Sequence, residues 1–298
     1  MAKPDRGALI AKTHKVLKKH YKPVTYTDRP LLESLIFGCC LENTRYEPAE
    51  AAYKALATGF FDWNEVRVST VDELAESMNM VAEPQAQAAS VKKVLYGIFE
   101  STYSFDIESM KKMNLGAAVQ KLEKIEGITP FVIGVITQAS LGGHAIPLDR
   151  GAFLALKSVG IATPADETKG VVPGLERAIP KTKGVEFGSL LHQLGADLAA
   201  SPYSTNLHKV LLEINPDAKD SLPKRPPKNV EKPAAPAAES PAPAKAESKS
   251  DKGSAERKPM PVGKKKPELK KPAPARKPEK VSPKKKAAAG SLSKRKPR

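Results

Sequence analysis

The distribution of charge and proline divides the chain at about residue 216. Residues 1–216 carry 24 Lys and Arg against 24 Asp and Glu, whereas residues 217–298 carry 25 against 9, so the whole excess of +16 lies in the last segment. That segment also has 15 of the 27 prolines and no Phe, Tyr or Trp. Without aromatic side chains it cannot bury enough apolar area to offset its conformational entropy. The sequence therefore predicts a folded body, 1–216, and a disordered basic tail, 217–298.

The composition of the body excludes several classes of protein. A chain of about 216 residues buries roughly 70% of its unfolded surface, so it needs no disulfide bond or structural metal to be stable. Two cysteines and five histidines exclude a disulfide-rich scaffold, and the adjacent Cys39 and Cys40 are expected to be buried free thiols. Because no run of about 18 apolar residues occurs, we expect a soluble, cytoplasmic protein with no membrane role.

Apolar residues in the body recur at helical spacing, and no stretch alternates as a half-buried strand does. Pro30, Pro48 and Pro84 are expected near helix starts, and Gly127 and Gly160 just after helix ends. The predicted fold class is all-α, with ten or so helices in one compact body or in two lobes. The predicted helices span about residues 8–19, 31–39, 49–57, 71–78, 91–99, 115–125, 131–141, 150–159, 167–178, 185–198 and 205–214.

Residues 115–159 are predicted to form a helix, a tight turn, a second helix, a loop and a third helix. The turn, 126–130, reads Glu-Gly-Ile-Thr-Pro, and the loop ends at Leu148-Asp149. This segment resembles the helix-hairpin-helix DNA glycosylases of the endonuclease III superfamily, whose Leu-Pro-Gly-hydrophobic-Gly hairpin precedes a helix and then a catalytic aspartate. Aligned without a gap, residues 125–129 take the hairpin and Asp149 takes the aspartate.

The resemblance extends over most of the body. Residues 29–44 look like the early helix of the family and its following loop, and residues 190–195 look like its late helix. The resemblance implies a two-lobed helical glycosylase-like fold.

The hairpin of such proteins binds DNA through its backbone. Amides at the turn, here those of Gly127, Ile128 and Thr129, point outward and hold a phosphate without basic side chains. Thr129 replaces the second glycine, where a left-handed backbone would be strained, and Pro130 removes one donor. The plainer alternative is that Gly127 ends one helix and Pro130 begins the next.

The resemblance makes Asp149 the candidate catalytic residue, because a carboxylate can stabilise the positive charge that develops on the sugar as a base departs. Asp149 is equally suited to cap the helix that follows it by accepting from the amide near Ala152, and a cap needs no active site. In the early loop of the family a glutamine often fills the gap left by a flipped base. Here Glu42, followed by Asn43, takes that place, and both are assigned to DNA binding. Because a carboxylate among phosphates is unfavourable, Asn43 or Tyr46 is the alternative for filling the gap.

Two departures from the family limit the chemistry. Bifunctional members place a lysine early in the helix after the hairpin, where it forms a Schiff base. That position is Phe131 here, so we expect no strand-cleaving lyase step. Residues 140–144 together with Leu148-Asp149 look more like the adenine-glycosylase branch, which only excises the base. No cysteine follows Gly195, so the four-iron cluster of many members is not expected, and we assign no metal or cofactor.

The composition of the tail resembles that of linker-histone-like tails. Spaced lysines on a Pro- and Ala-rich chain stay extended and neutralise phosphates in a salt-dependent, sequence-indifferent way. The alternatives are that the tail serves only solubility, or binds acidic proteins or RNA. The lysines assigned to DNA binding are Lys264, Lys265, Lys266, Lys284, Lys285 and Lys286.

Two hypotheses follow. In the leading one, the chain is a monomeric protein of the base-excision-repair glycosylase type, associated with the nucleoid or chromatin, that acts on damaged or mismatched double-stranded DNA. In the alternative, it is a catalytically inactive DNA-binding or nucleoid-associated protein with a histone-like tail. Glu42, Thr129, Pro130 and Phe131 favour the alternative. The discriminating observation is whether Asp149 faces an open polar cleft or is sealed under other side chains.

Overall fold

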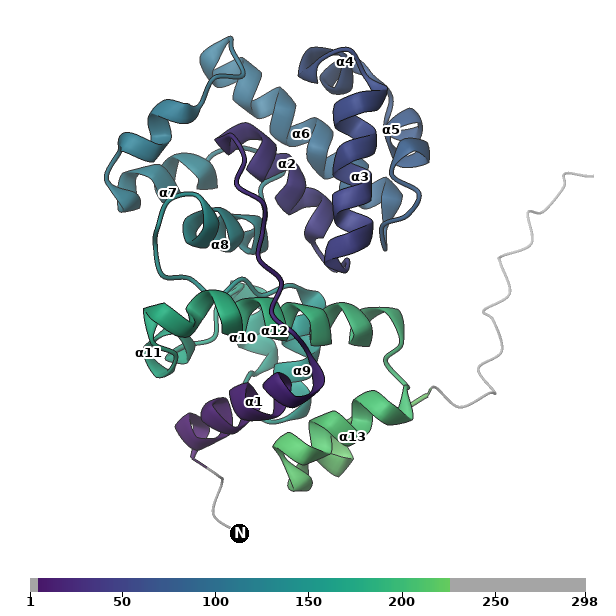
Figure 1. The fold of residues 1–298 in the computed structure, drawn as a ribbon, viewed down its shortest axis with the longest axis vertical. Helices are drawn as coiled ribbons and strands as arrows, with labels where there is room; N and C mark the ends of the chain where they lie inside the picture. The colour runs from purple at the N-terminus through teal and green to yellow at the C-terminus, as the bar shows by residue number, and fades with distance from the viewer. Residues whose placement is uncertain (1–4, 226–298) are drawn as a thin grey trace, which may run out of the picture. The chain divides into compact units, whose positions relative to one another are not determined.

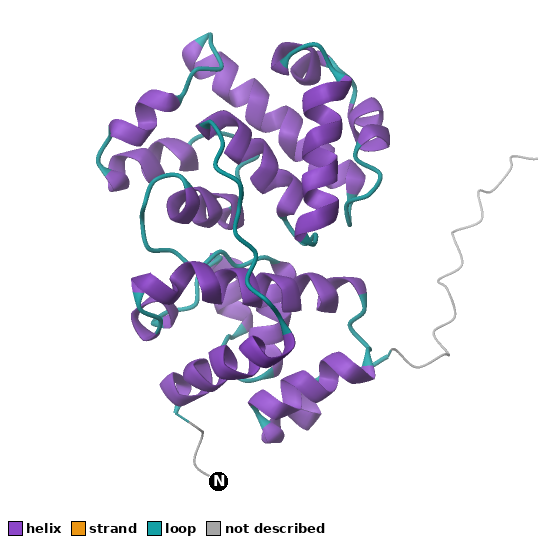
Figure 2. Ribbon diagram, in the orientation of Figure 1, coloured by secondary structure: helices purple, strands orange, loops and turns teal. Residues whose placement is uncertain are grey.

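A computed structural model of the chain describes residues 5–225, and over this range it consists of helices and loops (Figures 1 and 2). The predicted all-α class is therefore confirmed. No helix within the described range combines the length and the apolar character that crossing a membrane requires. The lysine runs at 264–266 and 284–286 lie outside the described residues.

The helices gather around two separate hydrophobic cores, which define two lobes (Figure 1). The helices of the first lobe are α2 (Leu31–Leu41), α3 (Tyr46–Gly59), α4 (Trp63–Val68), α5 (Val71–Ser77), α6 (Pro84–Thr102), α7 (Leu115–Glu123) and α8 (Pro130–Ala139), with a 3-10 turn η1 (Glu108–Lys112). The helices of the second lobe are α1 (Arg6–His20), α9 (Arg150–Ser158), α10 (Pro164–Lys169), α11 (Leu175–Ala178), α12 (Lys181–Ala200) and α13 (Thr205–Ile214), with a 3-10 turn η2 (Pro216–Ser221).

Local signals in the sequence explain where many of these helices begin and end. Pro84 and Pro130 occupy the first positions of α6 and α8, where a missing amide hydrogen costs nothing. Thr70 and Glu73 form a reciprocal capping box at the start of α5. Gly160, with a φ of 81°, follows the end of α9 in the left-handed conformation. The predicted boundaries at Pro84 and Gly160 are therefore confirmed.

The predicted helix over residues 167–178 is wrong. It is replaced by two short helices, α10 and α11, separated by Gly170 and Gly174. Both glycines have left-handed backbones, with φ of 67° and 82°, and a right-handed helix cannot continue through them. The apolar spacing indicated one helix because it ignored these two glycines. The prediction also lacked α4, which begins where the Asp62 carboxylate accepts from the Glu65 amide at 2.8 Å.

The second lobe depends on a close crossing of α9 and α12. A Cβ atom on Gly151 would collide with the carbonyl oxygen of Gly195, and one on Gly195 would lie 2.5 Å from the amide nitrogen of Ala152. Only glycine allows the two backbones to approach this closely. Asp149 lies just before Gly151, and His192 lies one turn before Gly195. The crossing therefore brings these two side chains together at the junction of the lobes.

Candidate functional site

The turn between α7 and α8 forms the predicted hairpin. Gly127 has a φ of 91°, and its carbonyl oxygen accepts a hydrogen bond of 2.8 Å from the hydroxyl of Ser90 on α6. A Cβ atom on Gly127 would lie 2.6 Å from the Cβ of Lys93. Both the backbone angle and the contact with α6 therefore require glycine here.

The amides of this turn are available to a ligand. Within residues 5–225, neither Gly127 nor Thr129 donates its backbone N–H to an acceptor in the chain. The N–H of Ile128 is engaged with the carbonyl oxygen of Ile125, at 3.3 Å. The turn is half-exposed. Two of the three amides assigned to phosphate binding are thus free, next to the positive end of the α8 dipole.

Thr129 is not strained, contrary to the expectation for a residue in the place of the second glycine. Its φ of −88° and ψ of 160° are extended, and its hydroxyl accepts from the amide of Val132 at 3.3 Å. Thr129 is therefore the N-cap of α8, and Pro130 follows as the first helical residue. The hairpin closes with a capped helix start instead of a second glycine turn.

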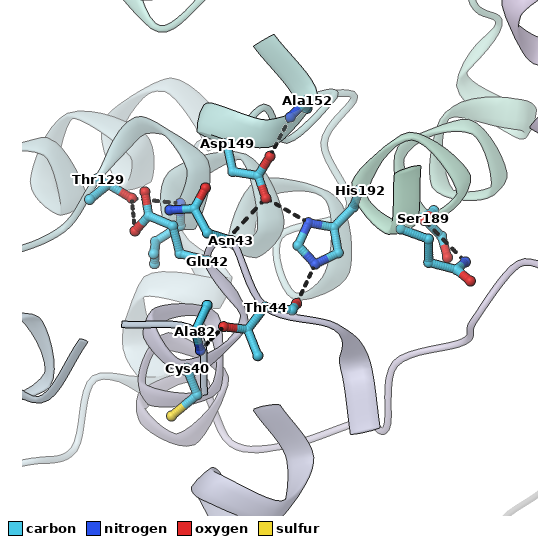
Figure 3. Close-up of polar contacts among 12 residues, drawn as sticks. Cys40, Glu42, Asn43, Thr44, Ala82, Thr129, Asp149, Ala152, Ser189 and His192 are labelled. Carbon is cyan, nitrogen blue, oxygen red and sulfur yellow. Dashed lines mark hydrogen bonds and ion pairs between the residues drawn. The ribbon is translucent and has the colours of Figure 1, made fainter. Parts of the chain in front are cut away.

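Glu42 lies beside this hairpin (Figure 3). The hydroxyl of Thr129 donates to the Glu42 carboxylate at 3.0 Å. Burial raises the pKa of Glu42 to about 6; the Thr129 hydrogen bond opposes this rise, and the carboxylate of Asp149 adds to it. At neutral pH the free amides of the hairpin therefore have a negative charge as a near neighbour.

Asn43 is turned toward Asp149 by its backbone. It has a left-handed φ of 55°, and its N–H donates to the Asp149 carboxylate at 3.2 Å. Its side-chain oxygen is buried and has no hydrogen-bond partner within the described range. The residue assigned to DNA contact thus anchors the loop after α2 to the start of α9.

The carboxylate of Asp149 is fully enclosed (Figure 3). Its side chain has 0% exposed surface. One oxygen caps α9 by accepting from the amide of Ala152 at 2.7 Å, and the other faces Asn43 and His192. Burial acts to raise the pKa of Asp149, but His192 and the two amides outweigh it, so the pKa lies below its ordinary value.

His192 covers the carboxylate of Asp149. Its Nδ1 lies 3.0 Å from the Asp149 carboxylate, and its Nε2 donates to the carbonyl oxygen of Thr44 at 2.9 Å. Burial lowers the pKa of His192, yet Asp149 and Thr44 together raise it above its ordinary value. Both neighbours are acceptors, which favours the protonated ring, and the contact between Nδ1 and Asp149 is an ion pair without hydrogen-bond geometry. Phe131 stacks on this ring, with centroids 5.3 Å apart.

No local pattern in the sequence predicts this pairing, because a lone histidine in a helical protein is usually a surface or capping residue. His192 is instead 3% exposed and forms an ion pair. The available signal is Gly195, which marks the close crossing with α9 one turn further along α12.

A cavity of about 290 Å³ lies next to the hairpin and the start of α9. Its lining includes Glu42, Phe131, Arg150 and Phe153, and Asp149 forms part of its wall. However, the Asp149 side chain has no exposed surface and all its donors are protein groups. The carboxyl-bearing residues of this lining that remain partly exposed are Glu42 and Glu167.

The remaining polar and sulfur groups define no further centre. Cys39 and Cys40 are buried free thiols, as predicted, and burial raises the pKa of Cys39 to about 12. In the described part of the chain, no three His, Cys, Asp or Glu side chains lie close enough to hold a metal ion.

Comparison with solved structures assigns the fold. Endonuclease III in a non-covalent complex with DNA matches with a TM-score of 0.52 and 16% identity, over 72% of this chain and 99% of that one. An 8-oxoguanine glycosylase/lyase of Clostridium acetobutylicum in complex with DNA matches at 0.45 and 17%, over 63% and 69% of the two chains. The 3-methyladenine DNA glycosylase of H. pylori bound to 1,N6-ethenoadenine matches at 0.41 and 16%, over 74% and 100%.

The chain therefore has the helix-hairpin-helix fold of the endonuclease III-like DNA glycosylases. The resemblance inferred from the hairpin is confirmed at the level of the fold. No protein-family model and no curated protein matches the sequence. This structural similarity establishes the fold alone, because the activity of a protein depends on the residues of its site.

Proposed function

We propose that this protein binds double-stranded DNA through its hairpin and does not cleave the N-glycosidic bond. Of the two hypotheses from the sequence, the geometry supports the non-catalytic one best. The observation that carries the proposal is the state of Asp149, whose carboxylate is 0% exposed and paired with His192.

The chemistry of base excision needs a carboxylate that can reach the sugar. A carboxylate stabilises a developing positive charge only when it lies close to the reacting carbon, in a space that the substrate can enter. Here the carboxylate of Asp149 is already ion-paired with His192 and accepts hydrogen bonds from the amides of Asn43 and Ala152. Phe131 occupies the position of the Schiff-base lysine and packs against the same histidine. The arrangement fits a structural ion pair that ties the lobes together.

Phosphate binding by the hairpin is supported by two free amides at a helix start. The N–H groups of Gly127 and Thr129 have no acceptor within the described range, and the α8 dipole favours an anion there. Backbone donors of this kind hold a phosphate whatever the base sequence. The residues we assign to this contact are Gly127 and Thr129, with Ile128 shaping the turn.

The test uses the full-length protein and a panel of duplexes containing alkylated, oxidised, deaminated or mismatched bases. We expect measurable binding to every duplex, no release of any base, and no covalent adduct after borohydride treatment. Base release by the wild-type protein that Asp149→Asn abolishes would overturn the proposal and establish a glycosylase. Asp197→Asn is the matched control, because Asp197 is also an ion-paired, mostly buried carboxylate of the second lobe. Absence of duplex binding would overturn the DNA-binding part.

The basic residues after 216 are proposed to supply sequence-indifferent affinity, on the strength of their composition alone. Removing residues 226–298 is expected to lower the affinity for any duplex and to flatten its dependence on salt. The difference between wild type and Gly127→Ala should remain after this removal, since it arises in the hairpin. If the removal leaves the salt dependence unchanged, the tail does not contact DNA.

A further inference from the structure

A groove of about 690 Å³ lies along α6, away from the cavity beside Asp149. We call it the α6 groove. Its polar and aromatic lining consists mainly of Lys92, Lys93, Tyr96, Glu100, Lys124 and Glu126. Nothing in the hairpin contact proposed above uses these side chains.

The α6 groove begins where the hairpin ends. Ser90, Lys93 and Gly97 lie at helical spacing on the face of α6 that contacts the turn. Ser90 holds the carbonyl of Gly127, and Lys93 packs under it. A Cβ atom on Gly97 would lie 3.1 Å from the side chain of Ile125, so the turn also rests on this glycine. The groove therefore adjoins the hairpin turn, whose residues Lys124 and Glu126 form part of its lining.

Two lysines of the groove, Lys93 and Lys124, are available to an anion, whereas the ammonium group of Lys92 donates to the carbonyl oxygens of Val68 and Ser69. Lys124 is exposed and forms no ion pair in the described part of the protein. Lys93 lies 3.4 Å from Glu126, but the two side chains are 58% and 79% exposed, and such exposed pairs contribute little. A phosphate can take the place of Glu126 at small cost. Glu100 is the second carboxylate of the groove.

A cation and an exposed aromatic ring extend this surface. Arg67 of α4 lies over the ring of Tyr96, 5.1 Å from its centroid, and Tyr96 is 45% exposed. With Arg67 included, four cations face two carboxylates. Basic side chains along one groove can neutralise the successive phosphates of a nucleic-acid backbone.

The opposite flank of the hairpin carries the opposite charge. There Glu42 accepts from Thr129, and Arg150 is held by Glu83 at 2.8 Å. Phosphates repeat along a strand, so a backbone held at the turn presents further phosphates to one flank or the other. The lysine flank attracts them and the Glu42 flank repels them.

We infer that the α6 groove binds the phosphates of the DNA strand that continues from the hairpin. The backbone then runs along α6 past Lys93 and Lys124, and away from Glu42. This inference rests on the proposed function, because it requires the hairpin to hold the first phosphate.

The first experiment is lysine footprinting on the full-length protein. Acetylation of exposed lysines is measured by mass spectrometry with and without a saturating undamaged duplex. We expect the duplex to protect Lys93 and Lys124, while Lys209 and Lys219, exposed on the second lobe, stay reactive. Equal reactivity of Lys93 and Lys124 with and without DNA overturns the inference. Protection of the same two lysines by polyglutamate to the same extent also overturns it, and assigns the groove to acidic protein segments.

The second experiment compares two charge-matched variants. Lys93→Glu/Lys124→Glu and Lys209→Glu/Lys219→Glu change the net charge equally, so the second variant controls for long-range electrostatics. We expect the groove variant to lose roughly ten-fold more affinity and to lower the salt slope by about two, as the loss of two phosphate contacts predicts. Lys124→Glu alone, which leaves the contact between Lys93 and the hairpin intact, should give about half of this change in slope.

The outcomes separate this inference from the proposed function. If wild type binds duplex and Gly127→Ala weakens it, but the groove and control variants behave alike, the hairpin contact stands and the groove is rejected. If wild type binds no duplex, the proposed function itself fails. Circular dichroism and thermal unfolding of each variant establish that it is folded.

Discussion

The hairpin and the start of α9 both come from the segment that resembles a glycosylase, yet they differ in what they leave free. At the hairpin, the amides of Gly127 and Thr129 have no acceptor within the described range. At the start of α9, the two Asp149 oxygens face Ala152, Asn43 and His192, and the side chain has no exposed surface. We propose that the first region binds a ligand and that the second holds the protein together.

Under this proposal, the DNA-binding element and the catalytic element of one fold are separable. The hairpin needs only a glycine and a helix start, so it tolerates Thr129 and Pro130. The carboxylate needs an open space around it, and two residues, His192 and Phe131, are enough to fill that space. An aligned aspartate is therefore weak support for catalysis until its surroundings are known.

The largest expected effect is on stability, from His192→Leu. The change leaves the Asp149 carboxylate buried without its cation, which should lower the free energy of unfolding by about 3–5 kcal/mol. Denaturant unfolding measures this loss. The double variant Asp149→Asn/His192→Leu should be more stable than His192→Leu alone, because no buried charge remains. A small loss of unfolding free energy in His192→Leu would contradict the structural role of the ion pair and favour a catalytic role for Asp149.

The ion pair of Asp149 and His192 should stabilise the protein within a limited range of pH. The pKa of Asp149 is lowered by folding, so its contribution exists above its ordinary value of 3.8 and is lost as the pH falls. The pKa of His192 is raised, so its contribution is complete below its ordinary value of 6.5 and is lost as the pH rises through the folded value. The stability difference between wild type and the double variant should therefore be greatest between these two values.

The second effect concerns Gly127→Ala, with Gly142→Ala as its matched control. Both glycines have left-handed backbones, with φ of 91° and 62°, but a Cβ on Gly142 meets nothing within 4 Å. The control should lose about 1 kcal/mol from backbone strain. Gly127→Ala should lose about 2–3 kcal/mol, because its Cβ also collides with α6. Only Gly127→Ala should weaken duplex binding. An equal loss of affinity for duplex in both variants would show that the hairpin does not contact DNA.

The third effect is produced by Glu42→Gln, which keeps an acceptor for Thr129 but removes the charge. Because folding raises the pKa of Glu42 to about 6, its charge costs stability above that pH. The variant should gain on the order of 1 kcal/mol and bind duplex a few-fold more tightly at about pH 8. Both gains should fade as the pH falls through 6. Glu47→Gln, on the surface of α3, should show neither gain, and a pH-independent gain in the Glu42 variant would refute this account.

The smallest effect is expected from Thr129→Val. Loss of the N-cap bond, which is long at 3.3 Å, should lower the free energy of unfolding by about 0.5 kcal/mol. The variant also removes the donor that lowers the pKa of Glu42, so this pKa should rise above 6. A carboxyl titration followed by NMR measures it. An unchanged pKa would mean that Thr129 and Glu42 do not interact in solution.

Much of the fold could be predicted because its signals are local. Apolar spacing and the prolines located α6 and α8, and Gly127 located the turn of the hairpin. The prediction over 167–178 failed where local apolar spacing was weighed above Gly170 and Gly174, although those glycines were visible in the sequence. The short helix α4 depends on a single cap at Asp62, a signal too weak to stand out without the packing around it.

The sequence by itself determined an all-helical body, a glycine turn after α7 and an aspartate at the start of α9, because each is specified by neighbours within a few residues. Only the tertiary structure decided what the aspartate does. The side chain that pairs with Asp149 lies on α12, far along the chain, and is brought there by the close approach of Gly151 and Gly195. Burial and pairing of a charge depend on such distant contacts, whereas capping and turning depend on adjacent ones.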